Sequence, residues 1–262
     1  MTVTDTRGPI APGLAPKKRW LTATVREVTI ETPRVRSLVL DVPGWPGHRA
    51  GQHVDVRLTA PDGYQAQRSY SIASAPAANT ITLTVEMLPD GEVSSYLAGE
   101  VQVGDKFELR GPIGGYFVWT PELEGPVFLV AGGSGIVPLM AILRERAAKG
   151  ALLGAMQPAR LIYSSRTYED IIYRAELEQL AGPGTGLAVV HTLTRGTPAG
   201  WTGLARRIDA MMLAEAGIPP DQMPRIFICG PTPLVETVAF TLRELGHSLK
   251  LIKTERFGPT GK

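Results

Sequence analysis

The hydrophobic pattern of this chain changes once, near residue 123, and the change divides the sequence into two structural classes. From Trp20 to about Leu123, short segments alternate apolar and polar residues, and Pro-Asp-Gly turns at residues 61–63 and 89–91 separate some of them. Such alternation is typical of antiparallel strands that are buried on one face. The sequence therefore predicts an antiparallel barrel or sandwich over residues 19–122, with a short helix at residues 93–98.

The second half has the pattern of an α/β domain. Residues 127–131 form a short, wholly apolar run, as expected for a parallel strand that is covered on both faces. Further strands are expected in RLIYSS, GLAVVHTLT and RIFICG, with helices after residue 138 and at 171–180, 205–215 and 234–245. Alternation of strands and helices favours a parallel sheet. We therefore expect a β plus α/β protein with domains at 19–122 and 123–262 and a flexible tail at 1–18.

Composition limits what such a chain can bind. Its 27 Lys and Arg residues against 25 Asp and Glu give a net charge of +2, which advertises no strong field for nucleic acid or acidic membranes. The single cysteine, Cys229, excludes an internal disulfide and an iron–sulfur cluster held by four cysteines. No apolar stretch is long enough to span a bilayer, and the four histidines lack metal-ligand spacing. We expect a cytoplasmic protein without membrane insertion or metal.

A glycine-rich turn follows the apolar strand at residues 127–131. Residues 132–135 read Gly-Gly-Ser-Gly, and Pro138 stands where a helix should begin. Glycines let the backbone approach a ligand closely, and a helix N-terminus attracts a pyrophosphate. A plain strand–helix connection is the alternative, while a hydrolase nucleophile elbow is excluded because Ile136 occupies its last glycine position. In this context the turn favours nucleotide binding.

Two other segments carry chemistry, RSYS at residues 68–71 and CGPTP at residues 229–233. Arg68 can pair with phosphate, Tyr70 offers a flat ring for stacking, and Ser71 offers a hydroxyl. Alone, RSYS would more often be an ordinary strand with a surface arginine. Cys229 stands at the end of an expected parallel strand, where α/β sheets bind ligands, although a small buried side chain is the plain alternative.

In this order the segments resemble the ferredoxin–NADP reductase-like family of FAD-dependent NAD(P)H oxidoreductases, over about Trp20 to the C-terminus. The motifs that carry the resemblance are RSYS, GEVSSYL at 91–97, GPIGGYF at 111–117, AGGSGIVP at 131–138 and CGPTP. The resemblance implies a flavin-binding antiparallel β-barrel followed by a parallel-sheet nucleotide-binding domain. It further implies an enzyme that passes hydride from NADPH to FAD, and then single electrons to a separate acceptor. The chain looks like bacterial members that lack a fused ferredoxin domain.

The resemblance also implies roles for single residues. Arg68 would neutralise the FAD diphosphate, Tyr70 would stack on the isoalloxazine, and Ser71 would hydrogen-bond near flavin N5. Residues 93–95 would offer N–H and hydroxyl groups to the pyrophosphate, and residues 85–86 would meet the ribityl chain. The residues expected at FAD are Arg68, Ser69, Tyr70, Ser71, Val85, Glu86, Gly91, Val93, Ser94, Ser95 and Phe257.

The pyridine nucleotide would lie on the second domain, with its nicotinamide beside Cys229. Its expected contacts are Gly133, Ser134, Gly135, Arg166, Thr194, Arg195, Cys229, Gly230 and Pro231. Glu255-Arg256-Phe257 resembles the family's acid–x–aromatic ending, which implies that Phe257 covers the flavin; a hydrophobic anchor is the alternative. The residues expected to act in hydride transfer are Ser71, Cys229, Glu255 and Phe257.

Arginines after two strands bear on the choice of nucleotide. Arg166 follows RLIYSS, and Thr194-Arg195 ends the next strand, where the family often places its 2′-phosphate site. Arginine complements that phosphate, whereas acids such as Glu169 and Asp170 would suit a ribose 2′-hydroxyl. We expect NADP(H) to be favoured over NAD(H).

The expected partner is a separate acceptor protein, namely a ferredoxin, a flavodoxin or an oxygenase component, and the chain is expected to be a monomer. Two alternatives stay open. One is an NADH-dependent reductase component of a multicomponent oxygenase, and the other is a non-catalytic flavin-binding regulatory subunit.

Overall fold

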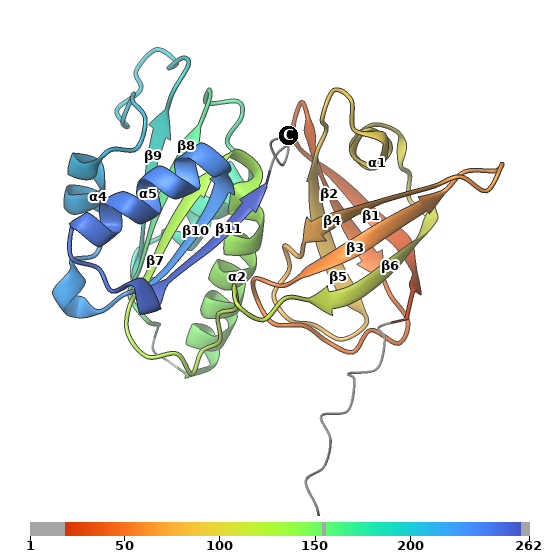
Figure 1. The fold of residues 1–262 in the computed structure, drawn as a ribbon, viewed down its shortest axis with the longest axis horizontal. Coiled ribbons are helices and arrows are strands. Elements are labelled where there is room, and N and C mark those ends of the chain that lie inside the picture. Colours follow the sequence, from red (N-terminus) through yellow and green to blue (C-terminus); the bar gives the residue numbers. More distant parts are fainter. Residues whose placement is uncertain (1–18, 154–155, 258–262) are drawn as a thin grey trace, which may run out of the picture.

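The protein consists of an antiparallel barrel beside a parallel sheet, in a computed structural model that describes residues 19–153 and 156–257. Figure 1 shows the parallel sheet on the left and the barrel on the right. The expected fold class, a β-barrel followed by an α/β unit, is confirmed. The tail expected at residues 1–18 lies outside the described residues.

Six strands form the barrel in the order β4-β3-β6-β1-β2-β5. They are β1 (Leu21–Thr32), β2 (Val35–Asp41), β3 (His53–Thr59), β4 (Gln65–Ser71), β5 (Thr80–Glu86) and β6 (Lys106–Ile113). A bridge between Ile72, directly after β4, and Leu83 in the middle of β5 joins these two strands, which closes the barrel. Helix α1 (Glu92–Ser95) continues into a π-helical turn (Tyr96–Glu100), so the short helix expected at residues 93–98 is present.

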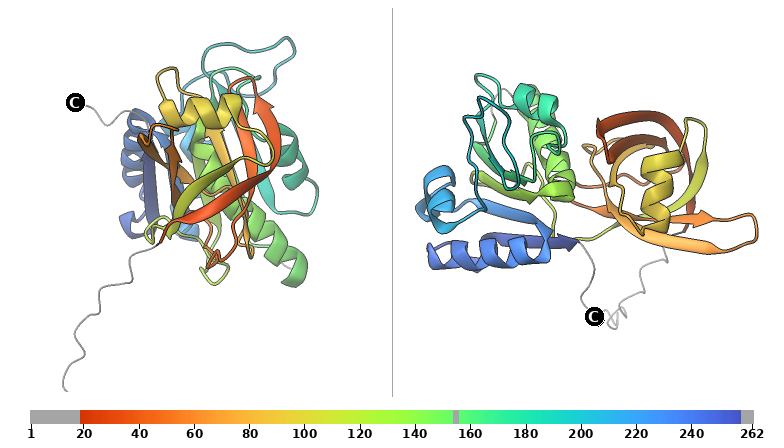
Figure 2. Two further views of the ribbon diagram at one scale, coloured as in Figure 1. Left: turned by 90° about the vertical axis from the view of Figure 1, so that its right-hand side faces the viewer. Right: turned by 90° about the horizontal axis from the view of Figure 1, so that it is seen from above.

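The parallel sheet has the order β11-β10-β7-β8-β9. Its strands are β7 (Val127–Gly132), β8 (Ala159–Ser165), β9 (Leu187–Leu193), β10 (Arg225–Pro231) and β11 (Ile252–Phe257). Its helices are α2 (Ile136–Leu153), α3 (Arg174–Leu180), α4 (Ala210–Ala216) and α5 (Thr232–Glu244). Alternate residues of β7 face two apolar clusters, one with α2 and α3 and the other with α4 and α5, so helices cover both faces (Figure 2).

Several details differ from the sequence expectation, and three of them change a strand or a helix start by three residues or more. Strand β11 was not expected at all. Helix α3 begins at Arg174 rather than at residue 171, because Tyr173 adopts a left-handed backbone conformation with φ 58°. Helix α4 begins at Ala210 rather than at residue 205, because the Asp209 side chain accepts a hydrogen bond from the Met212 N–H and caps the helix there.

The two halves share part of their core. Five buried residues that precede β7 in the sequence pack into the α/β apolar cluster: Val35, Ala50, Ala73, Phe117 and Trp119. Polar contacts add to this packing, because Tyr116 donates a hydrogen bond to the Ile252 carbonyl and Lys253 donates one to the Val118 carbonyl. The halves are therefore held side by side. We keep 19–122 and 123–262 as proposed domain limits.

No helix in the described ranges has the length and apolar character needed to cross a membrane.

Candidate functional site

The glycine-rich turn and the Cys-Gly-Pro segment meet at the carboxyl ends of β7 and β10. These neighbouring strands lie where the chain order reverses, which is where open α/β sheets bind ligands. A Cβ atom on Gly135 would stand 2.2 Å from the Cys229 carbonyl oxygen, so only glycine allows this approach. Gly133 has φ +54° and starts the 3-10 turn that leads into α2. The two segments thus pack backbone against backbone at residues 132–135 and 229–231, and we call this arrangement the backbone cradle.

A cavity of about 490 Å³ opens beside this cradle, with walls from both halves of the protein. On the α/β side it is lined by the predicted residues Gly133, Ser134, Arg166, Thr194, Arg195, Pro231 and Phe257. The barrel contributes Thr32, Arg34, Val35 and Glu86. Three other predicted contacts, Gly135, Cys229 and Gly230, are buried where the two loops meet. We call this space the nucleotide cavity.

Four arginines line the nucleotide cavity: Arg34 of the barrel, which pairs with Glu86, and three on the α/β side, one of which the sequence analysis missed. Arg207 joins Arg166 and Arg195 there, whereas its neighbour Arg206 pairs with Asp209 at 2.7 Å. The Arg195 N–H donates a hydrogen bond to the Arg166 carbonyl at 2.8 Å, which ties together the loops after β8 and β9. A cluster of guanidinium groups fits an additional phosphate.

Val85 and Glu86, the two residues expected at the ribityl chain, point to opposite faces of β5. Val85 is buried in the barrel core, so only its backbone is available to a ligand. Glu86 points the other way, lines the nucleotide cavity and pairs with Arg34 at 3.3 Å. Its carboxylate therefore lines the nucleotide cavity, and the contact of residues 85–86 with the ribityl chain stays a prediction.

A second cavity of about 270 Å³ brings together all four residues expected to act in hydride transfer, Ser71, Cys229, Glu255 and Phe257. His53, Ser69, Ser134, Pro138 and Arg256 complete its lining. Ser134 and Phe257 also line the nucleotide cavity, so the two cavities adjoin at these residues. We call the smaller space the transfer cavity.

Burial controls protonation in the transfer cavity. Desolvation raises the pKa of Glu255 to about 7, and its Oε2 atom has no hydrogen-bond partner among the described residues. The β10–β11 register sets Glu255 opposite Cys229, and burial followed by this neighbouring carboxylate raises the pKa of the Cys229 thiol well above its usual value. His53 Nδ1 lies 3.8 Å from Glu255 Oε1. Near neutral pH, Cys229 is thus a neutral thiol, and Glu255 is divided between its two forms.

On the barrel side, RSYS forms the end of β4. Alternation places exposed Arg68 and half-buried Tyr70 on one face, and Ser69 and Ser71 on the other, toward the transfer cavity. Ser69 donates a hydrogen bond to Asp55, and desolvation raises the pKa of the Tyr70 phenol, which stays neutral. A cationic side chain, a flat ring and a hydroxyl at one strand end fit the diphosphate and ring of a flavin nucleotide.

The segment at residues 91–95 turns sharply into α1. The Ser94 hydroxyl donates to the Gly91 carbonyl, and the Ser95 hydroxyl donates to the Leu88 carbonyl, so both are used within the segment. Val93 is buried in the barrel core. The first-turn N–H groups, which have no partner within a helix, are therefore the donors that suit a pyrophosphate.

Glu255 gives a pH-dependent stability that can be measured. Its pKa is raised in the folded state, so its protonated form is favoured there, and the stabilisation is lost as pH rises through about 7. From pH 5 to pH 8, this carboxyl should reduce the free energy of unfolding by roughly 2 to 3 kcal/mol. Urea unfolding of Glu255→Gln should show a correspondingly weaker decline, whereas exposed Glu244→Gln should match the parent. An unchanged decline in Glu255→Gln would contradict the assignment.

Comparisons with known proteins agree with this geometry. Residues 22–118 match the oxidoreductase FAD-binding domain family, and residues 129–239 match the oxidoreductase NAD-binding domain family. The chain is 33% identical to ferredoxin–NADP reductase B of Sorangium cellulosum, over 91% of this chain and 94% of that protein. It is 33% identical to NADH-cytochrome b5 reductase 1 of Aspergillus oryzae, over 79% of this chain and 70% of that protein.

The chain is also similar to a reductase subunit of an oxygenase and to a solved FAD/NAD-binding domain. The chain is 32% identical to the glycine betaine monooxygenase reductase subunit of Chromohalobacter salexigens, over 81% of this chain but only 56% of that protein. The FAD/NAD-binding domain of nitric oxide dioxygenase from Vibrio cholerae superposes with a TM-score of 0.79 at 26% identity, over 91% of this chain and 99% of that domain. The chain therefore belongs to the ferredoxin–NADP reductase-like family and is an FAD-containing NAD(P)H oxidoreductase.

Proposed function

We propose that the protein passes hydride from NADPH to FAD and then delivers single electrons to a separate acceptor protein, a ferredoxin or a flavodoxin. One observation carries this proposal. The nucleotide cavity and the transfer cavity adjoin at Ser134 and Phe257, so a nucleotide bound in the first can reach the residues of the second. The relative named ferredoxin–NADP reductase B, which matches over nearly the whole of both chains, supports the acceptor class.

Bound FAD supplies a ring atom that accepts hydride and a means of releasing electrons one at a time. We propose that the Ser71 hydroxyl and the Glu255 carboxyl orient the two rings and hold a proton in the transfer cavity. Cys229, a neutral and buried thiol, offers a small contact against the nicotinamide. Phe257, 36% exposed at the end of β11, covers the site and limits the access of water.

The preference for NADPH is proposed on charge. Arg166, Arg195 and Arg207 all line one cavity, and the 2′-phosphate is the group that distinguishes NADPH from NADH. Asp170 also lines this cavity, and its side chain accepts hydrogen bonds from Thr167, which occupies part of its acceptor capacity. The cavity also contains Arg34 and Glu86, which pair with each other, so the three remaining arginines outweigh the one remaining acid, the partly engaged Asp170.

A second candidate function is the reductase component of an oxygenase. The likeness to a monooxygenase reductase subunit favours it, and that relative is longer than the matched region. Under this candidate the acceptor is an oxygenase component instead of a ferredoxin or flavodoxin. For either candidate function, we also propose that the protein is cytoplasmic and monomeric.

Anaerobic mixing of the flavin-loaded protein with NADPH or NADH tests the proposal. The visible flavin absorbance should bleach rapidly with NADPH and more slowly with NADH. Adding oxidised ferredoxin, flavodoxin or an oxygenase component to the reduced protein should then restore the absorbance with the true acceptor. A flavin that stays oxidised under an excess of both nucleotides would instead identify a non-catalytic flavin-binding subunit.

A further inference from the structure

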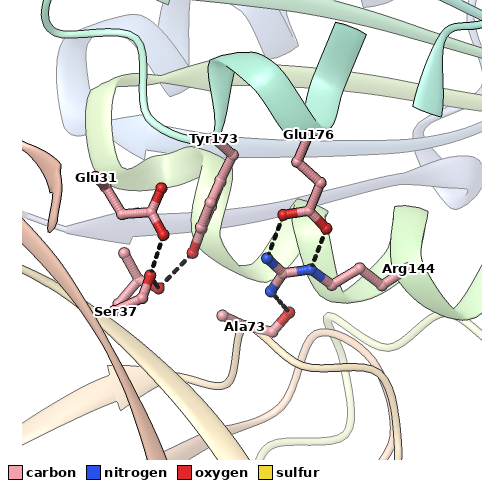
Figure 3. A network of polar contacts seen from close by, with 7 residues as sticks. Glu31, Ser37, Ala73, Arg144, Tyr173 and Glu176 are labelled. Atoms are coloured by element: carbon pink, nitrogen blue, oxygen red, sulfur yellow. Dashed lines mark hydrogen bonds and ion pairs between the residues drawn. The ribbon is translucent and has the colours of Figure 1, made fainter. Parts of the chain in front are cut away.

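A buried line of hydroxyl groups crosses between the two halves of the protein (Figure 3), and none of its residues lines the transfer cavity. Tyr173, in the turn before α3, donates a hydrogen bond to Thr84 Oγ1 of β5 at 2.5 Å. Thr84 lies 2.8 Å from Ser37 Oγ of β2, and Ser37 donates its own proton to Glu31. Thr84 therefore donates to Ser37, and the line runs in one direction from the α/β half to a carboxylate of the barrel.

Arg144 of α2 makes a second crossing beside the first. Its Nη1 donates to the Ala73 carbonyl of the barrel at 2.8 Å. Its Nε and Nη2 donate to both carboxylate oxygens of Glu176 on α3, at 2.7 and 2.6 Å. The guanidinium also lies over the Tyr173 ring, 4.9 Å from its centre. The two crossings thus join α2, α3 and the barrel in one assembly.

Burial makes these contacts well defined. Thr84, Ser37 and Tyr173 are each less than a tenth exposed. Burial raises the pKa of the Tyr173 phenol, so the hydroxyl keeps the proton that it donates. Burial alone would lower the pKa of Arg144, but hydrogen bonds to Glu176 raise it overall, so the cation persists. Tyr173 has φ 58°, a backbone conformation that is unfavourable for a residue other than glycine. Such a conformation persists only where the surrounding contacts hold it, as the buried contacts of Tyr173 do here.

The line lies directly behind the nucleotide cavity. Ile172, Glu86 and Val35 all line that cavity. Ile172 adjoins Tyr173 in the sequence, while Glu86 and Val35 stand two residues from Thr84 and Ser37 on the same strand faces. A change in the Tyr173–Thr84 distance would therefore move the cavity residues of the barrel relative to those of the α/β half.

We propose that Tyr173 and Arg144 are positioning residues, which hold the α/β half at the angle that brings a bound nucleotide into line with the transfer cavity. The inference rests on the proposed hydride transfer. Since the predicted nucleotide contacts lie mainly on the α/β half, loss of the crossing should slow hydride transfer and leave nucleotide affinity largely intact. Small displacements suffice, because misplacement by about 1 Å can cost about a hundredfold in rate.

The chain offers matched controls for both residues. Tyr163 is a fully buried tyrosine whose hydroxyl accepts the Ile172 N–H within the α/β half. Arg146, also on α2, donates to the Gln157 and Thr185 carbonyls of that same half. Tyr163→Phe and Arg146→Lys therefore make the same chemical changes as Tyr173→Phe and Arg144→Lys without removing a hydrogen bond between the two halves. On the barrel side, Thr84→Val removes the hydroxyl, while Thr84→Ser keeps it.

The test uses flavin-loaded protein mixed anaerobically with saturating NADPH in a stopped-flow instrument. Tyr173→Phe, Arg144→Lys and Thr84→Val should slow flavin reduction by about ten- to a hundredfold and weaken the long-wavelength charge-transfer absorbance. Thr84→Ser and both control variants should stay within about threefold of the parent. The NADPH dissociation constant, the bound FAD and the urea midpoint of Tyr173→Phe and Arg144→Lys should match those of their controls.

Different outcomes overturn different claims. Rates of Tyr173→Phe and Thr84→Val equal to that of the parent would overturn the positioning role while leaving the proposed function intact. Equal losses of reduction rate in the crossing variants and in the control variants would show a general effect of buried substitutions. That result would also overturn the positioning role. A parent protein that neither nucleotide reduces would overturn the proposed function, and the positioning role with it.

Discussion

Replacing Arg195 and Arg207 together by alanine is expected to lower kcat/KM for NADPH by about 10²- to 10⁴-fold, because each charge-assisted hydrogen bond contributes about 1.5–3 kcal/mol. The same change should alter kcat/KM for NADH by less than about threefold, since that nucleotide has no 2′-phosphate for these side chains to bind. Steady-state rates with both nucleotides measure the effect. Each single variant should show a smaller loss in the same direction.

Arg243→Ala provides the control for a lost positive charge. Arg243 lies on α5, is half exposed and pairs with its neighbour Glu244 at 2.8 Å. Its removal should leave the ratio of the two kcat/KM values unchanged. If the double variant instead lost activity equally with NADPH and NADH, these arginines would bind a part that both nucleotides share, and the 2′-phosphate assignment would be wrong.

Reversing the charge at Arg68 is expected to produce a largely flavin-free protein. The proposed partner of Arg68 is the FAD diphosphate, and loss of a charge-assisted contact in Arg68→Ala should weaken FAD binding by about 10- to 150-fold. Arg68→Glu should weaken it further, because a carboxylate then faces the phosphates. Gel filtration followed by absorbance gives the FAD bound per chain, and titration of the flavin-free protein gives the affinity.

Arg26→Glu is the matched control for this charge reversal. Arg26 is a barrel arginine with a side chain 64% exposed, in a long surface pair with Asp41. Its reversal should leave the FAD content at the level of the parent. Full retention of FAD by Arg68→Glu would show that the diphosphate lies elsewhere, while loss of FAD by both variants would point to the overall charge of the barrel.

The architecture could be predicted from the sequence because each half buries its side chains with a distinct period. The alternating residues in β1 indicated a strand that is covered on one face, and the wholly apolar run in β7 indicated a strand that is covered on both faces. Strand β11 escaped because Lys253, Thr254, Glu255 and Arg256 follow one another without an apolar residue. Only its pairing with β10 makes this segment a strand.

Site residues could be predicted from the sequence where they belong to one short motif. Site residues that lie far apart in the sequence and meet only in the folded chain could not be predicted. Gly135 meets Cys229 because their turns follow two neighbouring strands, and the resemblance had already implied that both residues contact one bound nucleotide. Arg207 could not be identified in this way, because it follows Arg206 and nothing in the sequence shows which of the two faces the cavity. The bond between Tyr173 and Thr84 joins residues 89 positions apart, so only the folded chain reveals it.

The shared core has a consequence for recombination. Phe117 and Trp119 precede the proposed limit at residue 122, yet their side chains fill the apolar cluster around α2. Tyr116 and Val118 in turn exchange hydrogen bonds with β11 at the opposite end of the sequence. A chimaera that took its flavin half from another reductase and joined it at residue 122 would thus import foreign side chains into the nucleotide half. Residues 116–119 should travel with the nucleotide half, which makes the useful crossover point earlier than the change in sequence pattern indicates.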